Sequence, residues 1–368
     1  MKKEVSHANP QVFVSDCEGP ISKNDNAFEL ASNIISDGAR FFSLISKYDD
    51  VLVDIVKKQG YKVGDTLRLI LPLLKAYGAN DKKIRDFSAK NILLVPGAKD
   101  TLTFVMKIMP SFIVSTSYEQ YISALCTLTD FPFENTYCTR LNMDKYEISL
   151  EETKKLKELG KEIANLPMIE IPKNSTLLSE FSKRDQETVE RLDEIFWKEI
   201  SQMEAGRILI EVNPVGGTEK AKVVKDIIEK IGSSLGNVMY VGDSITDTQA
   251  LGVVRKNGGL AVSFNGNNYS VRESDVAVLS GDTIVTSVLA EAFSRLGKEG
   301  ALGLINEWNP YGLKKYCTVS ELRERMSMVF GSSFPQVERV TSGNVERLIS
   351  ESSVFRKTVR GEAIGKLG

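Results

Sequence analysis

The sequence predicts an α/β protein, because three short apolar runs are each followed by polar residues and then by a helix-like segment. These runs cover residues 12–15, 112–114 and 238–241. Each has the length of a buried strand, and each ends at carboxylate or hydroxyl side chains. The residues at these three strand ends are therefore the candidates for a functional site.

Composition narrows the class of protein. Of the 368 residues, 42% are hydrophobic and 26% are charged, which is ordinary for a globular protein that is long enough for more than one domain. The 47 basic and 49 acidic residues nearly balance, and no basic tract indicates a nucleic-acid partner. The densest apolar run, residues 67–76, is far shorter than the roughly 20 residues of a membrane-spanning helix. The first ten residues lack the apolar core of a signal peptide, so we expect a cytoplasmic protein without membrane insertion.

Cysteine and histidine exclude several kinds of site. The four cysteines show no Cys-x-x-Cys spacing, so neither a zinc site nor a redox pair is indicated. Cys17, between two acidic residues, is interpreted as a small apolar residue that points away from them. A Ser-His-Asp triad would need His7, the single histidine, which lies close to the N-terminus. Any catalysis must therefore use carboxylates, hydroxyls and lysines.

The first strand run ends at Asp16, and Glu18 follows two positions later before Gly19 and Pro20. Residues two apart in an extended chain point the same way, so both carboxylates can lie on one side of the strand end. Taken alone, the stretch also fits a strand followed by a solvated acidic turn.

Residues 24–91 show helical spacing of apolar residues and few strand-like runs, which predicts a helical insertion of about the size of a small domain. The second strand run then ends in Ser115, Thr116 and Ser117. Hydroxyls at a strand end beside a helix N-terminus can hold an anion, although a simple N-cap explains the same residues equally well.

The segment 151–202 is highly charged and contains two narrow apolar stripes, which predict a helical hairpin packed on itself. Residues 207–212 are expected to form a strand. A helix capped by Thr218 follows, with Lys220 in its first turn. A lysine there opposes the helix dipole, so it is either solvated or faces a functional anion.

The third strand run leads into Gly242, Asp243, Ser244 and Asp247. Two aspartates four residues apart at a strand-to-helix junction suit a hard divalent cation such as Mg²⁺, and helix capping explains only one of them well. Two further strands are expected at 260–264 and 275–279. Residues 296–368 end in a basic, glycine-bearing tail, in which we identify no chemistry.

Together, four stretches resemble the signatures of the haloacid dehalogenase (HAD) superfamily of Mg²⁺-dependent phosphatases. These signatures are a strand ending in Asp-x-Asp, a strand ending in Ser or Thr, a lysine that opens a helix, and the motif Gly-Asp-Ser-x-x-Asp. Their counterparts here are Asp16 with Glu18, Ser115, Lys220 and residues 242–247, in the family's order. The sequence departs from the family pattern at Glu18, where the family usually has Asp.

The likeness is greatest to the phosphoserine-phosphatase-like branch, in which a helical cap lies between the first two signatures. The order of core, insertion and tail is also similar to an archaeal HAD-like group described as an energy-converting hydrogenase subunit, although no motif carries that likeness. The resemblance implies a Rossmann-like parallel α/β sheet with a helical cap and a further helical insertion. The implied domains are a core of residues 1–23, 92–144 and 206–295, a cap of 24–91, an insertion of 145–205 and a C-terminal extension of 296–368.

The resemblance also implies a role for each signature residue. Asp16 is the nucleophile that forms an aspartyl-phosphate, and Glu18 is the general acid and base. Ser115 donates a hydrogen bond to the phosphoryl group, and Lys220 balances the charge of the nucleophile and that group. Mg²⁺ is held by Asp16, the main-chain carbonyl of Glu18 and Asp243, with Asp247 assisting. Further candidates for binding the substrate are Thr116, Ser117 and Ser244.

The implied function is hydrolysis of a small phosphorylated metabolite. Two alternatives stay open: a HAD scaffold retained as a binding or regulatory subunit, and a phosphotransferase or mutase that uses the same residues. Glu18, the charged hairpin and the unexplained tail favour the scaffold, and the intact set of signature residues opposes it. A protein partner or self-association through 145–205 or the C-terminal extension is a further expectation.

Overall fold

The computed structural model describes residues 9–365, so His7 lies outside the described residues. Seven strands form one sheet in the order β3-β2-β1-β4-β5-β6-β7. All neighbouring strands are parallel except β6 and β7, which are antiparallel. The strands are β1 (Val12–Ser15), β2 (Ser111–Tyr118), β3 (Thr136–Thr139), β4 (Val238–Gly242), β5 (Leu260–Phe264), β6 (Val276–Leu279) and β7 (Gln336–Arg339). The predicted parallel α/β fold is confirmed.

Helices cover both faces of this sheet because successive strand residues point to opposite sides. In β1, Val12 and Val14 pack with residues of α10 and α11, whereas Phe13 packs with residues of α5 and α13. The helices of the core are α5 (Ala98–Ile108), α6 (Glu119–Thr129), α10 (Thr218–Ile231), α11 (Thr248–Lys256), α12 (Asn268–Glu273) and α13 (Ile284–Asn306).

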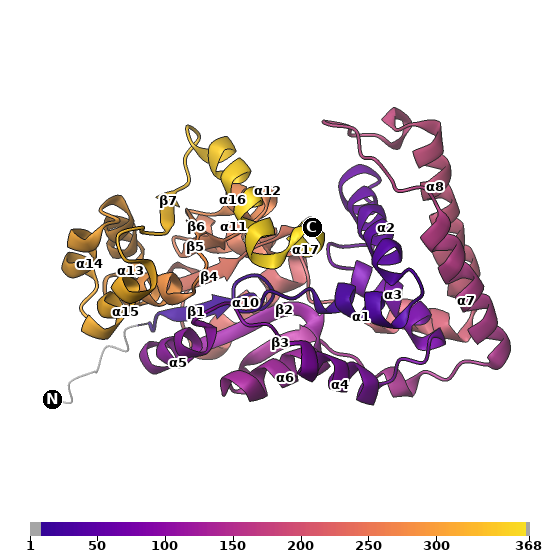
Figure 1. Ribbon diagram of the computed structural model, residues 1–368, viewed down its shortest axis with the longest axis horizontal. Helices are drawn as coiled ribbons and strands as arrows, with labels where there is room; N and C mark the ends of the chain where they lie inside the picture. The colour runs from indigo at the N-terminus through magenta and orange to yellow at the C-terminus, as the bar shows by residue number, and fades with distance from the viewer. Residues whose placement is uncertain (1–8, 366–368) are drawn as a thin grey trace.

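The cap lies beside the carboxyl ends of the strands (Figure 1). Its helices are α1 (Asn26–Ile34), α2 (Gly38–Asp50), α3 (Thr66–Ala76) and α4 (Asp81–Asn91), with a π-helical turn at Val51–Ile55. The predicted all-helical character of residues 24–91 is therefore confirmed.

The charged insertion contains α7 (Leu150–Asn165) and α8 (Lys183–Glu194). Its apolar stripes lie in one hydrophobic cluster with residues of the cap, so the hairpin does not pack on itself alone as expected. Phe196, just after α8, stacks on Tyr48 of α2 with 6.0 Å between the ring centroids. The Tyr48 hydroxyl in turn accepts a hydrogen bond from Trp197 Nε1 at 2.8 Å. The insertion and the cap thus share one hydrophobic cluster.

Residues 207–212 do not form the expected strand. Arg207–Glu211 is a short helix, α9, whose apolar residues pack in the cluster of the cap. Ile208, Leu209 and Val212 are buried while Ile210 is 80% exposed. That spacing fits one face of a helix and would not fit alternating burial along a strand. The core therefore resumes after residue 212 and not at 206.

The C-terminal extension returns to the core. It contains α14 (Pro310–Tyr316), α15 (Ser320–Phe330), the edge strand β7, α16 (Val345–Arg360) and α17 (Glu362–Gly365). Figure 1 shows its last helices, in yellow, with the C-terminus between the sheet and the cap. Among the residues described, no helix is long and apolar enough to cross a membrane.

Candidate active site

The sheet order brings the predicted residues together. Strands β2, β1 and β4 are adjacent, and the chain winds in opposite directions from β1 and β4. A parallel sheet forms its binding crevice at the carboxyl ends of the strands at such a switch point. Asp16 follows β1, Ser115 lies in β2, and Asp243 follows β4.

Asp16 is 5% exposed, and both its backbone and its carboxylate form contacts within the protein. Its backbone N–H donates to the carbonyl of Val241 in β4 at 2.8 Å. Its Oδ2 lies 2.7 Å from Lys220 Nζ, and its Oδ1 accepts the Cys17 N–H at 2.6 Å. The turn that follows leaves no space for a side chain at Gly19, where a Cβ would lie 2.2 Å from the Asp243 carboxyl carbon. The absence of a side chain at Gly19 thus lets the turn after Asp16 approach the Asp243 carboxylate.

Lys220 is fully buried between two carboxylates, in the first turn of α10. Its Nζ lies 2.7 Å from Asp16 and 2.8 Å from Asp247. Burial by itself lowers the pKa of an ammonium group, but the two negative charges outweigh it and raise the pKa of Lys220. The conflict with the helix dipole is therefore resolved by anions in front of the lysine and not by solvation.

Asp247 organises the loop after β4. Beyond Lys220, its carboxylate accepts hydrogen bonds from the Tyr240 hydroxyl at 2.7 Å and from the N–H groups of Asp243 and Ser244 at 3.0 and 3.2 Å. Burial opposes ionisation, yet Lys220 and these donors outweigh it and lower the pKa of Asp247. Its Oδ2 thus holds the backbone of Asp243 and Ser244, while its Oδ1 contacts Lys220 and Tyr240.

Three buried carboxylates converge at this point. Asp16, Asp243 and Asp247 each offer one oxygen, and these oxygens lie within 4.8 Å of one another. Burial, and next the charge of Asp247, raise the pKa of Asp16 to about 8 despite Lys220. Oxygen ligands at this spacing suit a hard cation such as Mg²⁺, which would relieve the repulsion among them.

Glu18 reaches towards the cap. Its Oε1 accepts the Asn26 N–H at 2.7 Å, at the start of α1. Burial, and next the charge of Asp25, raise the pKa of Glu18 well above its usual range. A raised pKa favours the protonated carboxyl group, which is the form that a general acid needs.

The candidate hydroxyl side chains differ in the hydrogen bonds that they already form within the protein. Ser115 is 1% exposed, and its Oγ accepts the Ser117 N–H at 3.2 Å. The Thr116 hydroxyl donates to the carbonyl of Val215 at 3.0 Å, and Ser244 Oγ lies 3.0 Å from the Thr246 hydroxyl. All of these candidates line the same cavity, but Thr116 and Ser244 already have protein partners.

This cavity of about 120 Å³ lies between the core and the cap. The core contributes Asp16, Glu18, Ser115 and Asp243 to its lining. The cap contributes a mixed wall that includes Asp25, Phe42, Asp49, Asp50, Thr66 and Leu67. A small substrate that enters would contact both parts of the protein.

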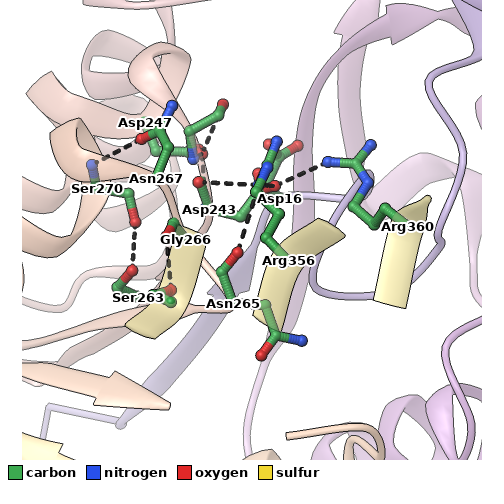
Figure 2. Close-up of polar contacts among 12 residues, drawn as sticks. Asp16, Asp243, Asp247, Ser263, Asn265, Gly266, Asn267, Ser270, Arg356 and Arg360 are labelled. Atoms are coloured by element: carbon green, nitrogen blue, oxygen red, sulfur yellow. Dashed lines mark hydrogen bonds and ion pairs between the residues drawn. The ribbon is translucent and has the colours of Figure 1, made fainter. Parts of the chain in front are cut away.

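Two lining residues, Arg356 and Arg360, were missed by the sequence analysis. Both lie on α16 of the C-terminal extension and form ion pairs with Asp243 Oδ2, as Figure 2 shows. The Arg360 Nη1 lies 3.0 Å from that oxygen, and its Nε donates to the carbonyl of Lys23 at 3.1 Å. The available signal was two arginines one helical turn apart in the basic tail. No local pattern, however, links that tail to the residue after β4.

Comparisons with known proteins agree with this geometry. A family model for haloacid dehalogenase-like hydrolases matches residues 100–264. A search of curated protein sequences finds no match. Among solved structures, gene product AF1437 from Archaeoglobus fulgidus is 25% identical with a TM-score of 0.79, over 98% of this chain and 99% of that one. The shared fold therefore includes the insertion and the C-terminal extension.

Two phosphoserine phosphatase structures are less similar. The apo form is 13% identical, with a TM-score of 0.41 over 74% of this chain and 95% of that one. The substrate-bound complex is 12% identical, with a TM-score of 0.44 over 77% and 98%. The four signatures at neighbouring strand ends, the sheet order and the family match agree: over residues 100–264, the chain is similar to haloacid dehalogenase-like hydrolases.

Proposed function

We propose that the protein is a cytoplasmic, Mg²⁺-dependent phosphatase that hydrolyses a small phosphorylated metabolite through an aspartyl-phosphate. One observation carries the proposal: the carboxylate of Asp16 is buried against Lys220 and lines a cavity together with Ser115 and Glu18. A nucleophile, a hydrogen-bond donor and a proton donor therefore lie around one space.

The residues present fit Mg²⁺. Candidate ligands are Asp16, Asp243 and the main-chain carbonyl of Glu18, with Asp247 assisting. All of these are oxygen donors, and the three aspartate oxygens lie within 4.8 Å of one another. When bound, the ion would neutralise part of the charge on the carboxylate nucleophile and the phosphoryl group.

In the first step, the Asp16 carboxylate attacks phosphorus and the bond from phosphorus to the leaving oxygen breaks. Glu18 protonates that oxygen, which its raised pKa allows. Ser115 donates a hydrogen bond to the transferring group, and Lys220 balances charge beside Asp16.

In the second step, Glu18, now ionised, takes a proton from water. The resulting hydroxide attacks phosphorus and releases Asp16 and inorganic phosphate. Lys220 stays paired with Asp247 throughout, so the site keeps a fixed cation beside the nucleophile.

A scaffold or regulatory role is the second candidate. The ion pairs of Arg356 and Arg360 with Asp243 favour it, since two cations already neutralise a proposed metal ligand. A phosphotransferase would use the same residues and differ only in the acceptor.

A screen of phosphorylated metabolites, with and without Mg²⁺, tests the proposal. We expect phosphate release from a narrow group of small substrates, and loss of release when the metal is chelated. Absence of turnover across such a screen would favour the scaffold, and product phosphorylated on an added alcohol would favour a transferase.

Metal binding gives a separate prediction. Replacing Asp243 with asparagine should weaken Mg²⁺ binding roughly 100-fold or more, because changes even outside the first ligand shell cost about 10- to 100-fold. The substitution removes a ligand charge and also leaves Arg356 and Arg360 without their carboxylate partner, so both effects repel a cation.

Titration calorimetry measures this effect. Asp226→Asn is the matched control, since Asp226 is exposed on α10 and does not line the cavity. Equal Mg²⁺ affinity for Asp243→Asn and the control would remove Asp243 from the ligand set.

A further inference from the structure

The C-terminal helix α16 is anchored on the core before it reaches the cavity. Leu348 packs with Val271, Ala277 and Leu279 of the core. One turn further along, Ser352 Oγ donates to the carbonyl of Gly266 at 2.6 Å. Two separate contacts thus set where the last two turns of α16 lie.

Those last turns bring Arg356 and Arg360 into the cavity wall. Their side chains are 4% and 5% exposed. Arg360 also donates through Nη2 to the carbonyl of Asn24, where the chain passes from the core into the cap. Arg360 therefore links the C-terminal extension, the loop after β4 and the base of the cap.

In the described part of the chain, these two arginines are the only cationic side chains that line the cavity. Lys220 lies beneath, fully buried between its carboxylates. The other charged residues of the lining are acidic, including Asp25, Asp49 and Asp50 of the cap. A phosphate ester would be repelled by such a wall, so the arginines are what makes the cavity suitable for an anion.

Arg356 has hydrogen-bonding capacity to spare. Its Nη1 contacts the carboxylate and, at 3.2 Å, the carbonyl of Asp243. Its Nε is buried and has no hydrogen-bond partner among the residues described. A buried donor without an acceptor is costly, and arginine binds phosphate through two parallel N–H groups. An oxyanion in the cavity would supply an acceptor.

The formal charges point the same way. The aspartates Asp16, Asp243 and Asp247 are balanced by the three cations Lys220, Arg356 and Arg360. A divalent cation and a phosphate dianion can then enter together without changing the net charge. Without the two arginines, the three aspartates, Lys220 and the same pair of ligands would carry a formal charge of about −2, to which the other acidic lining residues would add, and such a charge is unfavourable in a buried site.

We propose that Arg356 and Arg360 bind the phosphoryl group of the substrate, so that the C-terminal extension completes the anion-binding site. In the absence of an anion, the Asp243 carboxylate is their charged partner. The identity of the anion rests on the proposed function, but its binding is measurable without turnover. Phosphate and Mg²⁺ should bind with positive coupling, because the metal neutralises the carboxylate that competes for the guanidinium groups.

Calorimetric titration of the full-length protein with inorganic phosphate, with and without Mg²⁺, tests this proposal. Arg356→Gln and Arg360→Gln should each weaken phosphate binding roughly 10- to 100-fold, the usual range for a lost charge-assisted hydrogen bond. Arg347→Gln is the control on the same helix. Arg347 is exposed and pairs with Glu338 and Glu351 at 2.6 and 2.8 Å, and it does not line the cavity.

Thermal unfolding first checks that each variant is folded. If Arg356→Gln is not, Arg356→Lys keeps the charge, loses the planar pair of donors, and should bind phosphate more weakly than wild type. Unchanged phosphate affinity in folded variants would overturn the proposal. Tighter Mg²⁺ binding together with wild-type phosphate binding would also overturn it, since the arginines would then only compete with Mg²⁺ for the Asp243 carboxylate.

The proposal and the proposed function can fail separately. Phosphate binding that depends on the arginines, in a protein without turnover, would refute the phosphatase and support the anion site. Normal turnover and normal phosphate binding in both glutamine variants would support the phosphatase and refute the anion site.

Discussion

Replacing Asp16 with asparagine is expected to abolish phosphatase turnover, with a loss on the order of 10⁴-fold or more, as for other removed nucleophiles. An amide nitrogen cannot form the acyl-phosphate in place of the carboxylate oxygen. Lys220 keeps its contact with Asp247 at 2.8 Å, so the loop after β4 should retain its arrangement. We therefore expect little change in folding stability.

Steady-state phosphate release and thermal unfolding measure the two effects, with Asp226→Asn as the exposed control. Beryllofluoride should bind wild type as a mimic of the aspartyl-phosphate and should not bind Asp16→Asn. Substantial turnover by a pure preparation of Asp16→Asn would exclude the covalent mechanism.

Replacing Glu18 with glutamine should lower turnover by about 10²- to 10⁴-fold, the usual contribution of a positioned proton donor. Glutamine keeps a side-chain oxygen that can accept the Asn26 N–H, so the contact with the start of α1 at 2.7 Å is preserved. It cannot donate a proton as a carboxylic acid does. Mg²⁺ affinity should hardly change, because the proposed ligand at this position is the main-chain carbonyl.

Glu18→Asp distinguishes the effect of the carboxylic acid from the effect of the side-chain length. The shorter side chain retains a carboxylic acid and restores the usual residue of the family, so turnover should be kept or raised. A binding subunit would instead have almost no wild-type activity, and Glu18→Gln would change nothing. A well-defined wild-type rate that is unaffected by Glu18→Gln would refute the proposed mechanism and leave the fold unaffected.

The convergence of Asp16, Ser115, Lys220 and Asp243 could be predicted from the sequence because each lies beside a locally encoded element. Short apolar runs form parallel strands, and parallel strands end at one edge of the sheet. Three strands that each end in polar residues therefore place those residues close together at that edge. The roles of these residues in a reaction stay predictions.

Residues 207–212 show where local patterns fail. Their run of apolar residues fits a strand as well as one helical turn. The choice is made by the cap, because Ile208 and Leu209 fill its hydrophobic cluster only if they lie on one helical face. The apolar stripes of the insertion were identified correctly, but their packing partner was not. That partner is the cap, which lies about 100 residues earlier in the chain.

The sequence by itself determined the α/β core, the helical character of residues 24–91 and the acidic residues that converge at the strand ends, since strand periodicity and motif spacing are local properties. Only the tertiary structure decided that Arg356 and Arg360 lie beside Asp243. That contact spans more than 110 residues and depends on how α16 docks through Leu348 and Ser352. Packing between distant segments leaves no periodic signal near either arginine. The positive charge of each arginine is evident from the sequence, but the identity of its partner, Asp243, is not.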